Sequence, residues 1–448
     1  MKLKNIIGFL LLSMAFVTVA CDDDVEYTIT EVDAPVLVST TPENGSTNVS
    51  SGDVTISITY DKNVFFASSY ADQLIFTGGT VTSADVIGTS PTLTVNVNVP
   101  ERGTQCTLTI PEGLVTGPNQ MPAPEVSVTF TTTGLDQNPV YTLTAEAQRV
   151  YDFLQENFET RTISATMANV AWNTENAEQV YQWTGQYPAM NCFDYIHLAS
   201  SPANWIDYGD ITPVQQWWDN GGLVLAMWHW NVPRNEGDTD PNNYTFNLSE
   251  TTFDIDNAFT EGTWEYNTVH ADLEKIAGYL RLLHDANIPV IWRPLHEAAG
   301  GWFWWGKNAD SFKKLWVEMF NYFEAQSLNN LIWVWTSETG DADWYPGDAY
   351  VDIIGRDLYG NDAADCASQY QTLINDFGNK MITLSECGYS EYTDSTVGLL
   401  SEQWNAGARW LWFMPWYDSD NSTTPHADQT WWEDAMSQDY VIKRGEFR

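Results

Sequence analysis

Two kinds of hydrophobic pattern divide the chain. Between residues 34 and 134, short runs alternate apolar and polar side chains with period 2, and Gly, Pro and Asn turn signals separate them. The clearest runs span 54–60, 92–99 and 126–132. Short strands at this spacing predict an all-β, immunoglobulin-like sandwich over 34–134. The absence of any Trp from this region favours a spacer over a carbohydrate-binding module.

After a predicted linker at 135–145, the pattern changes to near-continuous apolar runs alternating with helical segments. Leu273, Ile276, Leu280 and Leu283 recur at helical spacing between two of these runs. Strands buried on both faces and interleaved with helices indicate an α/β domain over 146–448, either a (β/α)8 TIM barrel or a doubly wound open sheet. The eight predicted strands are 162–167, 192–198, 223–227, 289–295, 331–335, 351–355, 381–384 and 410–414.

The first 20 residues read as a signal peptide. Two lysines precede an apolar run that is too short to cross a bilayer as a mature helix. Ala20-Cys21 then resembles a bacterial lipoprotein processing site, and the three Asp residues at 22–24 resemble an acidic export tract. We therefore expect lipidation of Cys21, a tether over 21–33, and a lipid-anchored protein at the outer membrane, on the cell surface. A periplasmic or secreted protein is the alternative.

Charge and cysteine content narrow the possible partners. The net charge of −41 argues against nucleic acid and against anionic polymers, because both would be repelled, whereas a neutral polysaccharide is not. Cys106, Cys192, Cys366 and Cys387 lack metal-ligand spacing, and one disulfide among them is possible. We expect no cofactor and no metal.

The most informative candidate residue is Glu297, which follows the predicted strand at 289–295. The loop at 300–306 contains three Trp, one Phe and three Gly residues. The carboxyl ends of parallel strands are where loops converge on one site. Burial beside indoles raises the pKa of a carboxyl group and suits it to act as an acid. The four aromatics at 302–305 offer flat apolar faces for a sugar ring.

A second carboxylate, Glu386, follows the predicted strand at 381–384 and precedes Gly388. Taken alone, it fits a solvated loop residue equally well. Two Glu residues at the ends of two strands nevertheless match the requirement of glycoside hydrolysis, in which one group protonates the leaving oxygen and the other attacks or activates water.

Both segments resemble a known family. Arg293-Pro294-Leu295-His296-Glu297, with Gly300 and the aromatic run at 302–305, resembles the acid/base signature of glycoside hydrolase family 26. Ser385-Glu386-Cys387-Gly388 resembles that family's nucleophile strand. The resemblance covers about 140–448 and implies a (β/α)8 barrel and a retaining mechanism, with Glu297 as acid/base and Glu386 as nucleophile.

The resemblance also implies substrate-binding residues at strand ends. It puts two histidines in the cleavage subsite, a Tyr beside the nucleophile, an acceptor-side Trp platform, and a Trp floor under the reacting sugar that either of two residues could supply. Singly, each aromatic fits a core position and each histidine a structural one. The residues are His229, His296, Tyr359, Trp302 and, for the floor, Trp416 or Trp412; Asp357 also follows the sixth predicted strand.

The function expected from these features is retaining endo-β-1,4-mannanase activity, by double displacement, on mannan, galactomannan or glucomannan. The alternatives are a β-glucanase or β-xylanase of the same fold, or a non-catalytic surface glycan-binding lipoprotein. A pure binder has no need of both Glu297 and Glu386, which favours the enzyme. The expected partner is therefore a neutral plant β-mannan-type polysaccharide, bound by a monomer that contacts the membrane only through its lipid.

Overall fold

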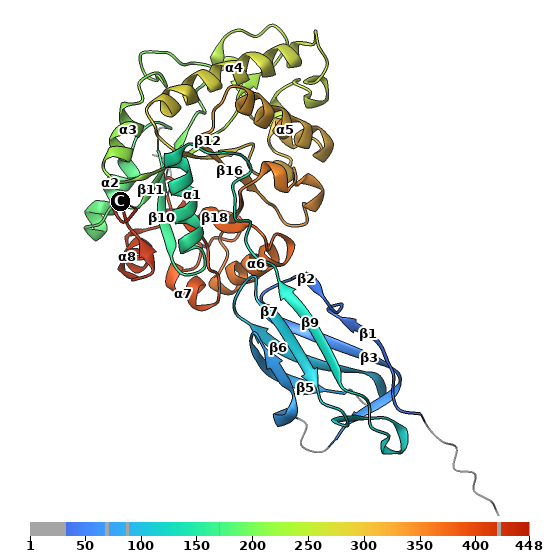
Figure 1. Ribbon diagram of the computed structural model, residues 1–448. Coiled ribbons are helices and arrows are strands. Elements are labelled where there is room, and N and C mark those ends of the chain that lie inside the picture. Colours follow the sequence, from blue (N-terminus) through green and yellow to red (C-terminus); the bar gives the residue numbers. More distant parts are fainter. Residues whose placement is uncertain (1–32, 68–70, 87–88, 170, 419–422, 448) are drawn as a thin grey trace, which may run out of the picture.

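The computed structural model describes residues 33–67, 71–86, 89–169, 171–418 and 423–447. The chain forms a β-sandwich followed by a larger α/β barrel (Figure 1), so the predicted fold class is confirmed. Cys21, the signal peptide and nearly all of the tether lie outside the described residues. Within the described ranges, no helix is both long and apolar enough to cross a membrane.

The sandwich strands are β1 (Leu37–Thr41), β2 (Ser46–Val49), β3 (Gly52–Phe66), β4 (Ile75–Thr77), β5 (Thr80–Asp85), β6 (Ser90–Val99), β7 (Gln105–Ile110), β8 (Val115–Thr116) and β9 (Val126–Thr132). One sheet has the order β1-β3-β6-β5, with β8 also paired to β3, and the other has the order β2-β9-β7-β4. Their inward side chains form a separate core, because alternate residues such as Ile56 and Ile58 are fully buried.

The barrel strands are β10 (Thr162–Met167), β11 (Met190–Asp194), β12 (Leu223–Trp228), β15 (Val290–Pro294), β16 (Leu331–Thr336), β17 (Ile353–Tyr359), β18 (Met381–Gly388) and β19 (Trp412–Pro415). They pair in parallel in this order, and pairing of β10 with both β11 and β19 closes the sheet. Closure decides against the open sheet that the sequence pattern also allowed. A short hairpin of β13 (Val232–Pro233) and β14 (Tyr244–Thr245) follows β12, and β20 (Val441–Ile442) pairs with β10.

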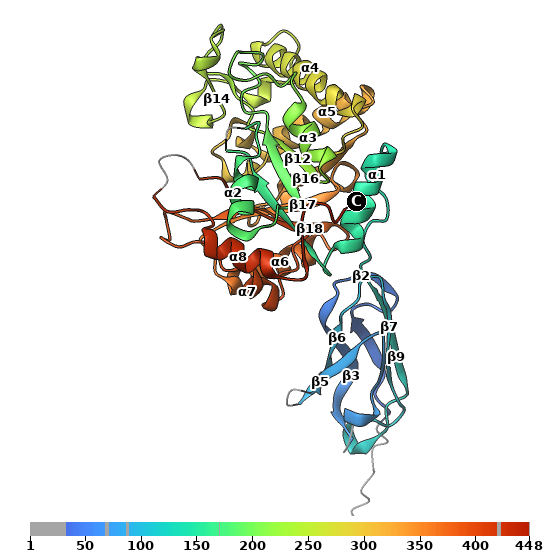
Figure 2. The ribbon, with the colours of Figure 1, turned by 90° about the vertical axis from the view of Figure 1, so that its left-hand side faces the viewer.

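Helices surround the barrel (Figure 2). They are α1 (Ala145–Asn157), α2 (Glu175–Thr184), α3 (Thr212–Asp219), α4 (Trp264–Asp285), α5 (Ala309–Ala325), α6 (Ala363–Asp376), α7 (Leu400–Asn405) and α8 (Gln429–Ser437). Side-chain caps fix several starts, because Thr263, Asn308 and Asp362 each accept a hydrogen bond from a first-turn amide. The predicted helix around Leu273 to Leu283 is confirmed as α4.

Some predicted strand limits were wrong. The second strand was expected at 192–198, but β11 ends at Asp194 because the chain then turns, with the Leu198 amide donating to the Tyr195 carbonyl. The sixth and seventh strands extend beyond their predicted ends at 355 and 384, to Tyr359 and Gly388. Polar residues there pair within the sheet, so polarity concealed the continuation.

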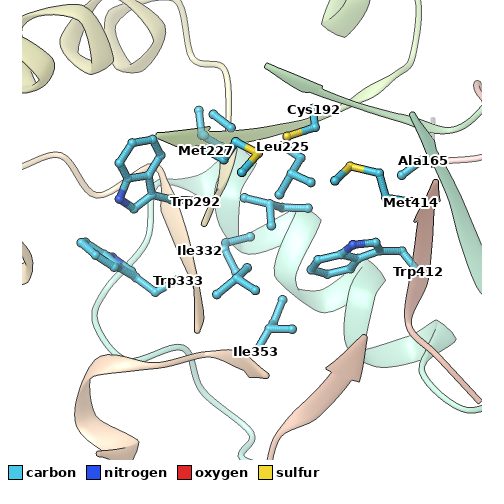
Figure 3. Close-up of a cluster of buried hydrophobic side chains, with 14 of the residues drawn as sticks. Ala165, Cys192, Leu225, Met227, Trp292, Ile332, Trp333, Ile353, Trp412 and Met414 are labelled. Atoms are coloured by element: carbon cyan, nitrogen blue, oxygen red, sulfur yellow. The ribbon is translucent and has the colours of Figure 1, made fainter. Parts of the chain in front are cut away.

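The barrel core joins side chains from most strands into one apolar cluster (Figure 3). Fully buried residues from different strands, including Leu225 on β12, Ile332 on β16 and Ile353 on β17, contribute to this cluster. The four described cysteines are buried and unpaired, so the disulfide considered possible is absent from the described residues.

The sandwich attaches to the amino-terminal side of the barrel strands. Arg102 forms an ion pair with Glu159 at 3.0 Å, between α1 and β10, and donates to the Gly378 carbonyl shortly before β18. Its guanidinium also lies 5.5 Å from the centre of the Phe158 ring. The sandwich therefore meets the face opposite the carboxyl ends of the strands, and leaves those ends open.

Candidate active site

The two predicted glutamates converge at the carboxyl end of the barrel. Glu386 lies within β18, where a register shift in the pairing of β17 with β18 at Ser385 sets Glu386 opposite Asp357. Glu297 follows β15 in a left-handed backbone conformation with φ of 50°, and Leu295 has φ of 49°. Two non-glycine residues in this region within three positions are strained, which is typical of functional sites. One oxygen each of Glu297, Asp357 and Glu386 lies within 4.8 Å of the others.

Arg293 connects the carboxylates. Its Nη1 donates to Glu386 Oε1 at 2.5 Å, its Nη2 donates to Asp357 Oδ2, and its Nε donates to Thr336 Oγ1 at 2.9 Å. The guanidinium is fully buried. A buried charge is tolerable only when it is paired and hydrogen-bonded, as it is here. Arg293 therefore supplies the positive charge that Asp357 and Glu386 share.

The electrostatics separate the two glutamates. Burial raises the pKa of Glu297, and the negative charges of Asp357 and Glu386 raise it further. Burial and Asp357 also raise the pKa of Glu386, but Arg293 and a 2.7 Å hydrogen bond from the Tyr359 hydroxyl oppose this rise. Glu386 is therefore the first of the two to ionise, and Glu297 the one that keeps its proton.

The aromatic run at 302–305 does not act as one platform, so that expectation was wrong. Phe303, Trp304 and Trp305 are buried, with the Trp304 and Trp305 Nε1 groups donating to the carbonyls of Trp230 and His296 at 2.6 and 2.9 Å. They hold the acid/base loop in position. Only Trp302 is exposed, at 46%.

The Trp302 indole lies against the backbone of the same loop and beside the carboxyl group of Glu297. Its Nε1 donates to Glu297 Oε2 at 3.0 Å. A Cβ at position 300 would overlap the Trp302 ring, so any residue larger than glycine there would displace the indole from this position. The segment after β12 braces this loop, since the Leu248 amide donates to the Trp302 carbonyl at 2.7 Å and the Trp304 amide to the Phe246 carbonyl at 2.9 Å.

The two predicted histidines lie together. Their rings are 4.5 Å apart, and His229 Nδ1 lies 2.6 Å from Asp194 Oδ2. Asp194 also accepts from the His229 amide at 3.1 Å, which orients the ring. Burial lowers the pKa of His296 well below its ordinary value, so His296 is neutral at pH 7.

Two tryptophans at the eighth strand were candidates for the floor under the reacting sugar, and their burial distinguishes them. Trp412 is fully buried in the barrel core (Figure 3) and presents no surface to a ligand. Trp416 is half-buried, with its ring 5.9 Å from that of His229. Its amide donates to the carbonyl of Cys387, next to Glu386, at 2.9 Å. Trp416 is therefore the one adjacent to the site.

Three polar residues at the site were not singled out from the sequence. Arg293 stands in the same motif as Glu297 and could have been found there. Asp194 was hidden by the misplaced end of the second strand. Glu338, just after β16, is largely buried, and burial, with Asp357 next, raises its pKa to about 7. Its position at a strand end was the only available signal.

Comparisons with known proteins agree on one family. The family model described as "Glycosyl hydrolase family 26" matches residues 140–446, and that of a bacterial Ig-like domain matches 31–132. A mannan endo-1,4-β-mannosidase B of Piromyces sp is 37% identical over 283 residues, which cover 60% of this chain. The chain spans only 46% of that relative's length.

Two solved structures are similar over the barrel. The family 26 domain of an endo-β-mannanase/endo-β-glucanase from Prevotella bryantii is 41% identical, with a TM-score of 0.65, over 69% of this chain and 99% of that domain. A β-mannanase from a symbiotic protist of the termite Reticulitermes speratus, complexed with gluco-manno-oligosaccharide, is 34% identical, with a TM-score of 0.60, over 70% of this chain and 98% of that one.

Proposed function

The chain belongs to glycosyl hydrolase family 26, and on that premise we propose that it is a retaining endo-β-1,4-mannanase acting on mannan, galactomannan or glucomannan. The observation that carries the proposal is the approach of the Glu297 and Glu386 carboxyl oxygens to within 4.8 Å. Retaining glycosidases hold their two carboxyl groups ~5–5.5 Å apart, whereas inverting ones need ~6.5–9.5 Å to admit a water. The names of the relatives support mannan as the substrate class.

In the first step, Glu386 is the nucleophile and Glu297 the acid. The Glu386 carboxylate attacks the anomeric carbon while Glu297 gives its proton to the glycosidic oxygen, so the leaving sugar departs as an alcohol. The raised pKa of Glu297 supports this role, since the group must be protonated at working pH. Arg293 and Tyr359 favour the ionised form of Glu386 and orient its oxygens.

In the second step the ester on Glu386 is hydrolysed. Glu297, now a carboxylate, takes a proton from a water that attacks the anomeric carbon, and Glu386 leaves as carboxylate. The two inversions restore the starting configuration. We assign Trp302 to the acceptor side, because it touches the acid, and Trp416, His229 and His296 to the sugar in the cleavage subsite. Asp357 acts through Arg293 and Ser385, each of which it binds.

A polysaccharide panel with product sizing tests this proposal. We expect rapid cleavage of linear mannan, galactomannan or glucomannan into short oligosaccharides, with newly formed reducing ends in the β configuration by NMR at early times. Mixed-linkage β-glucan and β-xylan serve as controls. If either control polysaccharide were cleaved faster than the mannans, that polysaccharide would be assigned as the substrate instead. First products in the α configuration would overturn the retaining mechanism.

We further propose that Cys21 is lipidated and holds the enzyme at the outer membrane, facing outwards. The described chain begins at the end of the sandwich remote from the barrel (Figure 1), and the sandwich meets the barrel opposite the active site. This arrangement suits an anchored enzyme whose cleft faces away from the membrane. All residues assigned a role lie on one chain, so a monomer suffices.

Replacing Cys21 with serine should move the enzyme from the membrane to the soluble fraction with kcat unchanged, because the catalytic residues lie in another domain. Stable anchoring requires more than one acyl chain, as lipoproteins have, so loss of the modified thiol should release the protein completely. Fractionation with activity assays measures this, and protease treatment of intact cells tests surface exposure. Membrane retention of the variant would contradict the proposal.

A further inference from the structure

We propose that Trp205 and His197, on the loop after β11, form a sugar-binding subsite on the donor side of the cleft, distant from the point of cleavage. The inference rests on the proposed function and extends it to a residue pair that the motifs did not single out. The ligand is a neutral hexopyranose unit of the polysaccharide, lying towards its non-reducing end.

The exposure of Trp205 sets it apart. The sequence contains 22 tryptophans, all within the described residues, and only Trp205 and Trp302 are exposed, at 61% and 46%. Trp302 is the platform beside the acid. Trp205 is the more exposed of the two and also belongs to a loop at the carboxyl end of the barrel strands, where a substrate chain would extend past it.

The backbone holds Trp205 at the tip of a tight turn. The Ala203 amide donates to the Ile206 carbonyl at 2.8 Å, and the Ile206 amide donates back to the Ala203 carbonyl at 3.1 Å. Ile206 is buried and Trp205 is not, so the turn is anchored on one side and presents the indole on the other. A platform fixed in this way loses little conformational entropy when a ligand binds.

His197 completes a pair suited to a sugar. The His197 and Trp205 rings meet edge to face with centroids 4.8 Å apart. In the described parts of the chain, no hydrogen bond engages the His197 ring, although burial lowers its pKa, which favours the neutral form. A neutral imidazole carries one donor and one acceptor nitrogen. The indole face matches the CH surface of a pyranose, and the imidazole can bond its hydroxyl groups.

The order of strands assigns the pair to the donor side. Glu297 and Trp302 follow β15, β12 lies next to β15 and leads to His229, and β11 lies next to β12. In the other direction, β11 neighbours β10, and β10 neighbours β19, which leads to Trp416. The loop carrying Trp205 therefore lies between the elements of His229 and Trp416, which face the donor sugar, and away from Trp302.

Replacing Trp205 with alanine should lower kcat/KM on long manno-oligosaccharides and polymer by about 5- to 10-fold, the effect of one lost aromatic contact. Oligosaccharides too short to reach the subsite should be cleaved at the wild-type rate. Reducing-end-labelled oligosaccharides report which bond is cut. Because the variant binds fewer sugars on the donor side, the cleaved bond should shift towards the non-reducing end. Trp205→Phe should restore much of the length dependence.

The matched control is Tyr181→Ala, which removes an exposed aromatic from α2 outside the loops of the cleft. It should change neither the length dependence nor the cut position. If Trp205→Ala equals wild type at every length, or weakens short and long substrates alike, the subsite is overturned. If wild-type enzyme does not cleave β-mannan at all, the proposed function fails instead, so the two failures are distinguishable.

Discussion

Replacing Glu386 with alanine should lower kcat on every substrate by at least about 10⁴-fold, since loss of a covalent nucleophile removes the whole reaction path. Activated aryl mannosides should not rescue the variant, because a better leaving group does not supply the missing attacking carboxylate. Steady-state rates on polymer and on an aryl glycoside measure this. Wild-type enzyme trapped with a slow fluorinated substrate should carry the sugar on the peptide containing Glu386.

Two controls make this result specific. Glu402→Ala removes an exposed carboxylate from α7 and should leave kcat unchanged. Glu386→Gln retains the shape of the side chain beside Arg293 and Tyr359, and should be equally inactive while melting near the wild-type temperature. The residual activity expected after loss of a nucleophile is far below about 1% of the wild-type value. If Glu386→Ala kept more than about 1% of wild-type activity, Glu386 would not form the covalent intermediate.

The parts of the fold that follow from hydrophobic periodicity were predictable. Long apolar runs ending at a carboxylate indicated β15 and β18, and regular helical spacing indicated α4. These signals are local, because the order of apolar and polar residues within each segment is enough to predict which of its faces are buried. Choosing the closed barrel over an open sheet required pairing of β10 with β11 and β19, which is a property of the whole chain.

The parts of the site that escaped prediction depend on contacts between distant segments. The exposure of an indole depends on the segments that pack against it. Trp304 packs against Trp230 in the loop after β12, and Trp305 donates to the His296 carbonyl just after β15, whereas Trp302 is left exposed. Asp194 orients the His229 ring only because the end of β11 lies beside His229 in the folded barrel. The contacts of Arg293 likewise join four strands, because Arg293 on β15 donates to Thr336 on β16, Asp357 on β17 and Glu386 on β18, and no local sequence pattern predicts contacts between segments so far apart in the chain.

Replacing Glu297 with alanine should lower kcat/KM on polysaccharide by about 10²–10⁴-fold, the usual contribution of a general acid. The loss of kcat/KM on aryl glycosides with good leaving groups should be much smaller, because these depart without protonation. The pH dependence supplies a second test. In wild type, activity requires protonated Glu297 and ionised Glu386, and burial raises the pKa of both. Both limbs of the profile should therefore lie above the ordinary range of carboxyl groups.

In Glu297→Ala, assayed on an aryl glycoside, the alkaline limb should disappear while the acid limb, set by Glu386, remains. Stability gives the matching control. A carboxyl whose pKa is raised by folding stabilises the protein below its ordinary pKa and loses that contribution as pH rises through the raised value. Glu297→Gln should thus gain stability relative to wild type as pH increases, which thermal melts across pH measure. Equal losses of kcat/KM on both substrates, with an unchanged alkaline limb, would assign the proton transfer to another group. The first residue to test would then be Glu338, a largely buried carboxyl whose charge also raises the pKa of Glu297.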